Sequence, residues 1–248
     1  MSASIAFRGI NKTYQTKQGI TPALQSFNLE IAQNNFVALV GPSGCGKSTV
    51  LHIAAGLDTQ YQGECLVSPV NCQRAYLFQA PRLLPWLTVA QNVSFIHEAR
   101  STSRRQAMQI AHHYLELVGL TEFAQSYPGH LSGGMQQRVA LARALSIRPD
   151  VMFMDEPFAS LDELTARKMR AQLLRLHADM PHTVLFVTHN ISEAVFLADR
   201  VGILSQHPGH LLTEIAVDVP RPREYDDPVL AVLAQQIFHQ LSQEEVLM

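Results

Sequence analysis

The segment GPSGCGKST, at residues 41–49, follows the pattern G-x-x-x-x-G-K-[ST] of a loop that binds phosphate groups. An apolar run at 36–40 precedes it and a helical pattern follows it, which is the context that the motif requires. Backbone N–H groups of such a loop converge on the phosphates, and a helix beginning near Lys47 directs the positive end of its dipole at them. The Lys47 ammonium would bind the β- and γ-phosphate oxygens, and the Ser48 hydroxyl would ligate Mg²⁺. The predicted binding residues are Gly41, Pro42, Ser43, Gly44, Cys45, Gly46, Lys47, Ser48 and Thr49.

Two carboxylates, Asp155 and Glu156, follow a second apolar run at 151–154. A buried strand here would bring them to the carboxyl edge of a parallel sheet, where open α/β folds bind ligands. Asp155 would then hold Mg²⁺ through water, and Glu156 would polarise an attacking water. A solvated strand end is the alternative for such a pair. Together with a phosphate loop, the pair indicates phosphoryl transfer from a nucleotide.

A second helix start suited to a phosphate lies at Ser132, Gly133 and Gly134, in the segment LSGGMQQRVALARAL. Its exposed N–H groups and hydroxyl would suit an anion, although a serine that caps an ordinary amphipathic helix is the common alternative. A phosphate loop serves kinases, GTPases, helicases and transport ATPases alike. This second feature therefore has to distinguish among them.

Apolar runs of strand length alternate with helical segments, which predicts an α/β fold with a parallel sheet covered on both faces. Residues 88–145 show helical periodicity with no convincing strand, so we expect a mostly helical insertion there. After residue 219 the sequence predicts an extended linker and an amphipathic helix near 229–241. Antiparallel N-terminal strands are expected at 5–8, 24–31, 36–40 and 65–67, and parallel strands at 75–78, 151–154, 183–187 and 201–204.

Composition excludes several classes of protein. The 248 residues carry 19 Lys and Arg against 21 Asp and Glu, and a net charge of −2 provides no field that would attract nucleic acid. The apolar runs are far shorter than the ~18 to 20 residues of a membrane-spanning helix. Three cysteines, an odd number, suggest reduced thiols, and the polar N-terminus lacks the apolar stretch of a signal peptide. We expect a cytoplasmic protein that does not cross a bilayer by itself.

The motifs and their order resemble the ATP-binding cassette (ABC) family, specifically its importer ATPases, over nearly the whole chain. They are the phosphate loop, a Gln loop at Gln79, LSGGMQQR at 131–138, the strand that ends in Asp155 and Glu156, SLD at 160–162, and His189 in FVTHN. The resemblance implies a P-loop NTPase core of the RecA-like type, an N-terminal antiparallel β subdomain and an inserted α-helical subdomain. It also implies one ABC ATPase domain over 1–248, with the core at 1–86 and 146–219, the helical subdomain at 87–145 and a C-terminal extension at 220–248.

In this family two ATPase subunits hold two ATP molecules, with Mg²⁺, between them in a head-to-tail dimer. Ser132 and Gly134 would then contact the γ-phosphate held by the partner subunit's Lys47. A twofold dimer builds each composite site from two different surfaces, which explains why one chain carries both features. Asp162 would shape the dimer interface.

Further roles are implied by matching positions. Tyr14 would stack on adenine, although a lone tyrosine often only packs. Gln79 would reach Mg²⁺ or the attacking water and sense the γ-phosphate, and His189 would hydrogen-bond the γ-phosphate and help orient Glu156. A polar strand end is the alternative for Gln79, and a structural histidine is the alternative for His189. Two arginines on the helix after LSGG are expected to form surface ion pairs and not to be catalytic: Arg138 and Arg143.

The segment APRLLPWLTVAQNV, at 80–93, is expected to expose Leu83, Leu84, Pro85 and Trp86. In the family this region forms the groove that receives a coupling helix of an integral membrane permease, and the chain's only tryptophan lies here. A loop whose apolar residues fold back onto the core is the alternative. LLPWLTV and the later PGHLLTEIAVDVPRPRE resemble the nitrate, sulfonate and taurine importer subgroup, from which importers of thiamine pyrimidine precursors are barely separable.

The implied partners are a second ATPase subunit, membrane permease subunits and a periplasmic or lipoprotein solute-binding protein, with no nucleic acid. The implied location is the cytoplasmic face of the inner membrane, reached through the permease. A soluble ABC switch of DNA repair or translation is one alternative, but such proteins usually carry long coiled-coil insertions or two cassettes. A metabolic P-loop kinase is another, and it leaves LSGGMQQR without a purpose.

Overall fold

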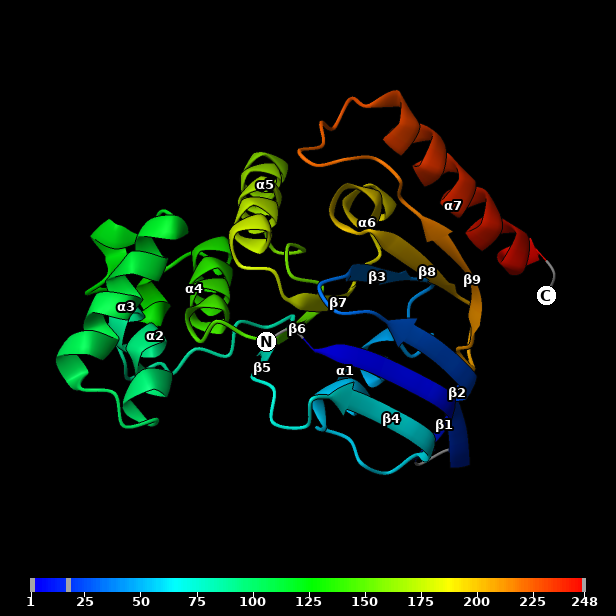
Figure 1. The fold of residues 1–248 in the computed structure, drawn as a ribbon, viewed down its shortest axis with the longest axis horizontal. Coiled ribbons are helices and arrows are strands. Elements are labelled where there is room, and N and C mark those ends of the chain that lie inside the picture. Colours follow the sequence, from blue (N-terminus) through cyan, green and yellow to red (C-terminus); the bar gives the residue numbers. More distant parts are fainter. Residues whose placement is uncertain (1–2, 17–18, 247–248) are drawn as a thin grey trace.

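The computed structural model describes residues 3–16 and 19–246, and two β-sheets form its centre (Figure 1). The smaller sheet is antiparallel, in the order β2-β1-β4, and the larger has the order β5-β6-β7-β3-β8-β9. Within the larger sheet all neighbours are parallel except β9, which runs antiparallel to β8. The strands are β1 (Ser4–Thr16), β2 (Gly19–Ile31), β3 (Phe36–Val40), β4 (Gln62–Ser68), β5 (Arg74–Leu77), β6 (Val151–Asp155), β7 (Thr183–Val187), β8 (Arg200–Leu204) and β9 (Leu211–Ala216).

Helices cover both faces of the larger sheet. On one face α1 packs against β6 and β7 and reaches β4 of the smaller sheet, whereas α5 and α6 cover the other face (Figure 1). The helices are α1 (Lys47–Ala55), α2 (Val89–Glu98), α3 (Arg104–Leu117), α4 (Gly133–Ser146), α5 (Glu163–Asp179), α6 (Ile191–Leu197) and α7 (Pro228–Val246). Two 3₁₀ turns, Thr121–Phe123 and Pro128–His130, precede α4.

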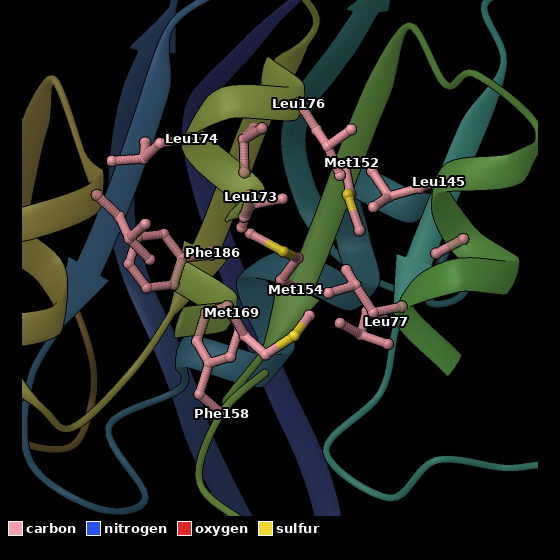
Figure 2. Close-up of a cluster of buried hydrophobic side chains, with 14 of the residues drawn as sticks. Leu77, Leu145, Met152, Met154, Phe158, Met169, Leu173, Leu174, Leu176 and Phe186 are labelled. Carbon is pink, nitrogen blue, oxygen red and sulfur yellow. The ribbon is translucent and has the colours of Figure 1, made fainter. Parts of the chain in front are cut away.

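Alternating residues of the central strands enter two different hydrophobic clusters. In β3, Phe36, Ala38 and Val40 join one cluster, and Val37 and Leu39 join the other. Successive side chains of a strand point to opposite faces, so a sheet covered on both faces needs continuous apolar strands. Figure 2 shows the first cluster, where side chains of β5, β6 and β7 meet those of α4 and α5.

The parallel strands and the helical insertion are confirmed, with α2, α3 and α4 packed on one another. The placement of β3 in the antiparallel N-terminal part is wrong, because β3 lies inside the parallel sheet between β7 and β8. The pattern did not predict β9. Among residues 3–16 and 19–246 we find no helix with the length and apolar character that crossing a membrane requires.

The segment 220–227 is not the free linker that its prolines suggested. Arg223 is buried in it and donates to the carbonyls of Val195, Phe196 and Ala198 at the end of α6. This arginine therefore ties the start of the C-terminal extension to the core. The predicted helix at 229–241 is present and longer, as α7.

Candidate functional site

Four of the predicted site features, the phosphate loop, Asp155, His189 and Gln79, lie at the carboxyl edge of the parallel sheet. The phosphate loop leaves β3 and leads into α1, and β6 ends at Asp155. His189 follows β7 by two residues, and Gln79 follows β5 by two residues. Because these four strands are parallel, their carboxyl ends lie at one edge, as the ligand-binding rule for open α/β sheets expects.

Glycines shape the phosphate loop. Gly44 (φ 80°) and Gly46 (φ 97°) adopt the left-handed conformation, and a Cβ on Gly46 would lie 2.8 Å from the carbonyl oxygen of Ala23. Gly46 is also the residue that caps α1, and no described side chain caps that helix. The first N–H groups of α1 are therefore left for an anion.

Lys47 is folded back onto the loop. Only 8% of it is exposed, and its Nζ donates to the carbonyl oxygens of Gly41 and Pro42, both at 2.8 Å. The same ammonium lies 3.7 Å from the sulfur of Cys45, whose thiol pKa is raised by burial. The Lys47 ammonium therefore lies beside the backbone of the loop that is predicted to bind phosphate.

Ser48 and Asp155, the two predicted magnesium ligands, contact each other. The Ser48 hydroxyl donates to Asp155 Oδ1 at 3.2 Å. Burial raises the pKa of Asp155, and the hydrogen bond from Ser48 opposes that rise. In the described part of the chain no group of three His, Cys, Asp or Glu could hold a metal alone. One carboxylate and one hydroxyl fit Mg²⁺, which takes oxygen ligands and is often completed by nucleotide phosphates.

The Glu156 carboxylate lies between two of the predicted catalytic residues. Gln79 Nε2 donates to its Oε2 at 3.3 Å, and His189 Nδ1 lies 3.2 Å from its Oε1. Glu156 has a φ of 44°, and its N–H donates to the carbonyl of Val187. A left-handed non-glycine backbone is costly, and strained residues of this kind cluster at functional sites.

Tyr14 lies beside α1. Its hydroxyl donates to Asp58 Oδ2 at 3.2 Å and is 3.3 Å from the Thr49 hydroxyl, while Lys12 Nζ lies 4.6 Å from its ring centroid. Burial raises the pKa of Asp58, but the hydrogen bonds and charge of Lys12 outweigh it and hold that pKa below its usual value. Tyr14 remains a prediction for adenine, and its neighbours place it next to the phosphate loop.

The segment Ser132–Gly134 starts α4, as expected. The Ser132 hydroxyl caps the helix by accepting from Met135 N at 3.2 Å, so the ordinary capping role is present. A Cβ on Gly134 would lie 2.8 Å from Leu161. No hydrogen bond among the described residues joins this segment to the phosphate loop of the same chain.

Asp162 caps α5 through Thr165 N at 3.0 Å, and this backbone hydrogen bond lowers the pKa of Asp162.

Two side chains of α4 hold the segment after β5, and sequence reasoning missed both roles. Gln137 is buried and donates to the carbonyl of Phe78 at 3.3 Å, next to Gln79. Arg143 donates to the carbonyls of Pro81 and Arg82 at 3.0 and 3.1 Å.

The expected surface ion pairs of Arg138 and Arg143 are therefore wrong. Arg138 donates to the carbonyl of Val118 at 3.1 Å, and Arg143 also bonds carbonyl groups of the backbone. Their role is to hold the chain segments that pack around α4. Only a three-dimensional arrangement reveals such contacts.

The apolar segment after Gln79 is held in a fixed turn. Buried Asn92 accepts from Leu84 N at 2.8 Å and donates to the carbonyls of Leu84, Leu87 and Thr88. Trp86, at the tip, is 69% exposed. The expectation of exposure holds for Pro85 and Trp86 and is wrong for Leu83 and Leu84, which are half-buried.

Comparisons with known proteins agree on one family. A family model described as ABC transporter matches residues 24–159. A putative ATP-binding protein of Brucella abortus is 45% identical, over 96% of this chain and 94% of the relative. The aliphatic sulfonates import ATP-binding protein SsuB 1 of Pseudomonas syringae pv. syringae is 43% identical, over 90% and 92% of the two chains. The nitrate import ATP-binding protein NrtD of Synechocystis is 40% identical, over 87% and 83%.

A solved structure agrees with these relatives. The dimeric structure of a post-hydrolysis state of the ATP-binding cassette MJ0796, bound to ADP and Pi, superposes with a TM-score of 0.79 at 32% identity. The match covers 87% of this chain and 100% of the other.

Proposed function

The chain belongs to the ABC transporter family and is an ATPase, and from that premise we propose that it is the ATP-hydrolysing subunit of an importer of nitrate-, sulfonate- or taurine-type anions. The observation that carries the catalytic part is the Glu156 carboxylate, held between Gln79 and His189 at the sheet edge that also bears the phosphate loop. The names of the sulfonate and nitrate relatives support the importer part.

ATP binds through its phosphates. The N–H groups of the loop and of the first turn of α1 bind the phosphate oxygens, and Lys47 exchanges its carbonyl partners for the β- and γ-phosphates. Tyr14 stacks on the adenine. Ser48 and Asp155, with Gln79, would hold Mg²⁺, which when bound would neutralise negative charge on the phosphate oxygens.

Glu156 acts as the general base for hydrolysis. It accepts a proton from a water whose oxygen attacks the γ-phosphorus, and the bond from that phosphorus to the β–γ bridging oxygen breaks to leave ADP and phosphate. Gln79 and His189 orient the carboxylate, and His189 also donates to the γ-phosphate. Proton transfer needs correct geometry first, and the two contacts at 3.3 and 3.2 Å support an oriented carboxylate.

A second copy completes each site. The start of α4 is exposed at Ser132 and Gly133, and among the described residues it shares no hydrogen bond with the phosphate loop. A head-to-tail dimer brings it to the γ-phosphate of the partner, with Asp162 at the interface. The cassette of similar fold was solved as a dimer, which supports this arrangement.

The transport part depends on other subunits. Trp86, exposed on a turn that Asn92 fixes, contacts a coupling helix of a membrane permease, which keeps the chain at the cytoplasmic face of the membrane. A solute-binding protein delivers the cargo. An importer of thiamine pyrimidine precursors would use the same machinery.

Two measurements test the proposal. Glu156→Gln should abolish ATP turnover and trap an ATP-bound dimer, seen as a shift in size-exclusion chromatography with ATP, and retained hydrolysis would overturn the role of Glu156. In the assembled transporter, a solute-binding protein loaded with nitrate or an alkanesulfonate should stimulate ATP hydrolysis. If only a solute-binding protein loaded with a pyrimidine stimulates hydrolysis, the cargo is a thiamine pyrimidine precursor and not an anion of the nitrate or sulfonate type.

A further inference from the structure

The residues around His189 form a closed hydrogen-bonded ring that includes a buried carboxylate. Thr188 donates from its hydroxyl to Glu193 Oε2 at 2.5 Å and accepts from Asn190 N at 3.0 Å. The side chain of Asn190 in turn accepts from Glu193 N at 3.1 Å. Both neighbours of His189 in the chain are therefore held by Glu193, Thr188 through the carboxylate and Asn190 through the backbone N–H.

Glu193 is one of the least exposed charged residues of the described chain, at 3%, and its second oxygen faces Arg170. Arg170 Nε lies 3.6 Å from Glu193 Oε1, and its Nη1 lies 3.5 Å from Glu163 Oε1. Burial raises the pKa of Glu193, while the hydrogen bond from Thr188 and the charge of Arg170 oppose that rise. An ion pair that is buried costs desolvation energy and adds little net stability, so its presence favours a role in fixing geometry.

We propose that Glu193 is a positioning residue for ATP hydrolysis, which acts through Thr188 to hold His189 against Glu156. The inference rests on the proposed function, because it requires that His189 orient Glu156. Arg170 extends the same network to α5, the helix that begins directly after Asp162. Glu193 itself touches neither the phosphate loop nor Glu156 through any hydrogen bond of the described residues.

The decisive variants are Thr188→Val, which removes the hydroxyl at nearly constant volume, and Glu193→Ala. Displacing a catalytic group by an ångström lowers rates by up to about 100-fold, so we expect kcat to fall between about 10- and 100-fold. The KM for ATP should stay within about twofold, because the phosphate loop is untouched. Thr188→Ser keeps the hydroxyl and should restore most of kcat.

A matched control separates positioning from stability. Arg223→Met removes contacts to the opposite end of the same helix, α6, and should lower the melting temperature without lowering kcat at a temperature where the variant is folded. If Glu193→Ala does not fold, Thr188→Val and Thr188→Ser carry the test alone. A kcat that Thr188→Val leaves unchanged overturns the proposal.

The dependence on His189 is tested by a double-mutant cycle. In a His189→Ala background, measured by single-turnover hydrolysis of labelled ATP, Thr188→Val should cause no further loss, whereas losses that multiply overturn the proposal. In protein with ¹³C-labelled histidine, the His189 resonance should shift in Thr188→Val and not in Arg223→Met. If His189→Ala alone leaves kcat unchanged, the role of His189 in the proposed function fails. If His189→Ala lowers kcat but Thr188→Val and Glu193→Ala leave it unchanged, this inference fails and the proposed function stands.

Discussion

The carbonyl oxygen of Cys45 lies 1.9 Å from the position that a Cβ on Gly209 would occupy. Gly209 lies in the connection between β8 and β9, and Cys45 lies in the phosphate loop. The Gly209 N–H donates to the carbonyl of Ala23, and its carbonyl accepts from Gln25 N, both at 3.0 Å. The connection therefore packs directly behind the loop and is fixed there by two backbone hydrogen bonds.

Gly209→Ala should weaken ATP binding. The added methyl group cannot occupy its place unless the Cys45 peptide moves, and that peptide belongs to the loop whose N–H groups we propose to bind the phosphates. Overpacking typically costs about 1–3 kcal/mol, so we expect both a lower melting temperature and a Kd for ATP raised by about tenfold. A fluorescent ATP analogue titrated into purified protein measures the affinity.

Gly129→Ala is the matched control, since a Cβ at Gly129 meets no atom within 4 Å. It should leave both affinity and melting temperature at the parent values. If Gly209→Ala binds ATP with the same affinity as the parent, the β8–β9 connection does not support the phosphate loop.

Arg223→Met should destabilise the whole chain. The buried guanidinium donates to three carbonyls at the end of α6 and to those of Val217 and Val219. Burial, with the nearby charge of Arg221, lowers the pKa of Arg223 to about 10, so it remains charged at neutral pH. Its loss leaves several buried acceptors unpaired, and we expect about 3 kcal/mol less free energy of unfolding, measured by urea denaturation. Arg175→Met is the control, because Arg175 is exposed, and it should change the free energy of unfolding little.

The residues of this site with catalytic or phosphate-binding chemistry could be predicted from sequence, because each lies at or after the end of a strand that appears in the sequence as a continuous apolar run. Lys47 and Asp155 were placed by motifs of a few residues and His189 by the order of motifs in the family it resembles, and parallel strands bring such ends together. Gly209 and Arg223 could not be predicted in this way. The segment PGH at 208–210 has the composition of a turn, and PRPRE at 220–224 has that of a linker. The atoms that Gly209 and Arg223 contact belong to segments far away in the chain.

The same reasoning explains the misplaced strand. β3 is a five-residue apolar run between antiparallel neighbours in sequence, and local patterning cannot show that it pairs with β7 and β8, more than 140 residues later. Arg138 and Arg143 were likewise assigned to a helix surface, because periodicity identifies a face but not the chain segment that packs on it.

Stability should fall between pH 7 and pH 5, in part because of His177. Burial lowers the pKa of this histidine to about 4, and its Nε2–H donates to the carbonyl of His182. The folded pKa lies below the unfolded value of about 6.5, so the unfolded state binds more protons in this window and the stabilisation present above pH 6.5 is lost as the pH falls. For His177 the loss is about 2 kcal/mol between pH 7 and pH 5.

His177→Gln should therefore flatten the pH dependence of the free energy of unfolding, measured by urea denaturation at each pH. His112→Gln, at an exposed position, provides the comparison and should keep the parent slope. If the slope is the same in His177→Gln and in the parent, His177 does not cause the loss of stability between pH 7 and pH 5.

Trp86→Ala should uncouple ATP hydrolysis from transport without impairing the isolated ATPase. The side chain is 69% exposed and lies outside the cluster of Glu156, Gln79 and His189, so its removal costs little stability and no catalytic contact. Tryptophan is enriched in binding hot spots, and truncating a hot spot costs about 2 kcal/mol or more of affinity. We expect basal kcat within about twofold of the parent, and at least a tenfold weaker association with the permease in detergent pull-down titrations. Phe238→Ala, which removes a similarly exposed aromatic from α7, should bind the permease normally. If both variants bind like the parent, the docking surface lies elsewhere on the molecule, and if both lose binding equally, the segment around Trp86 has no special part in it.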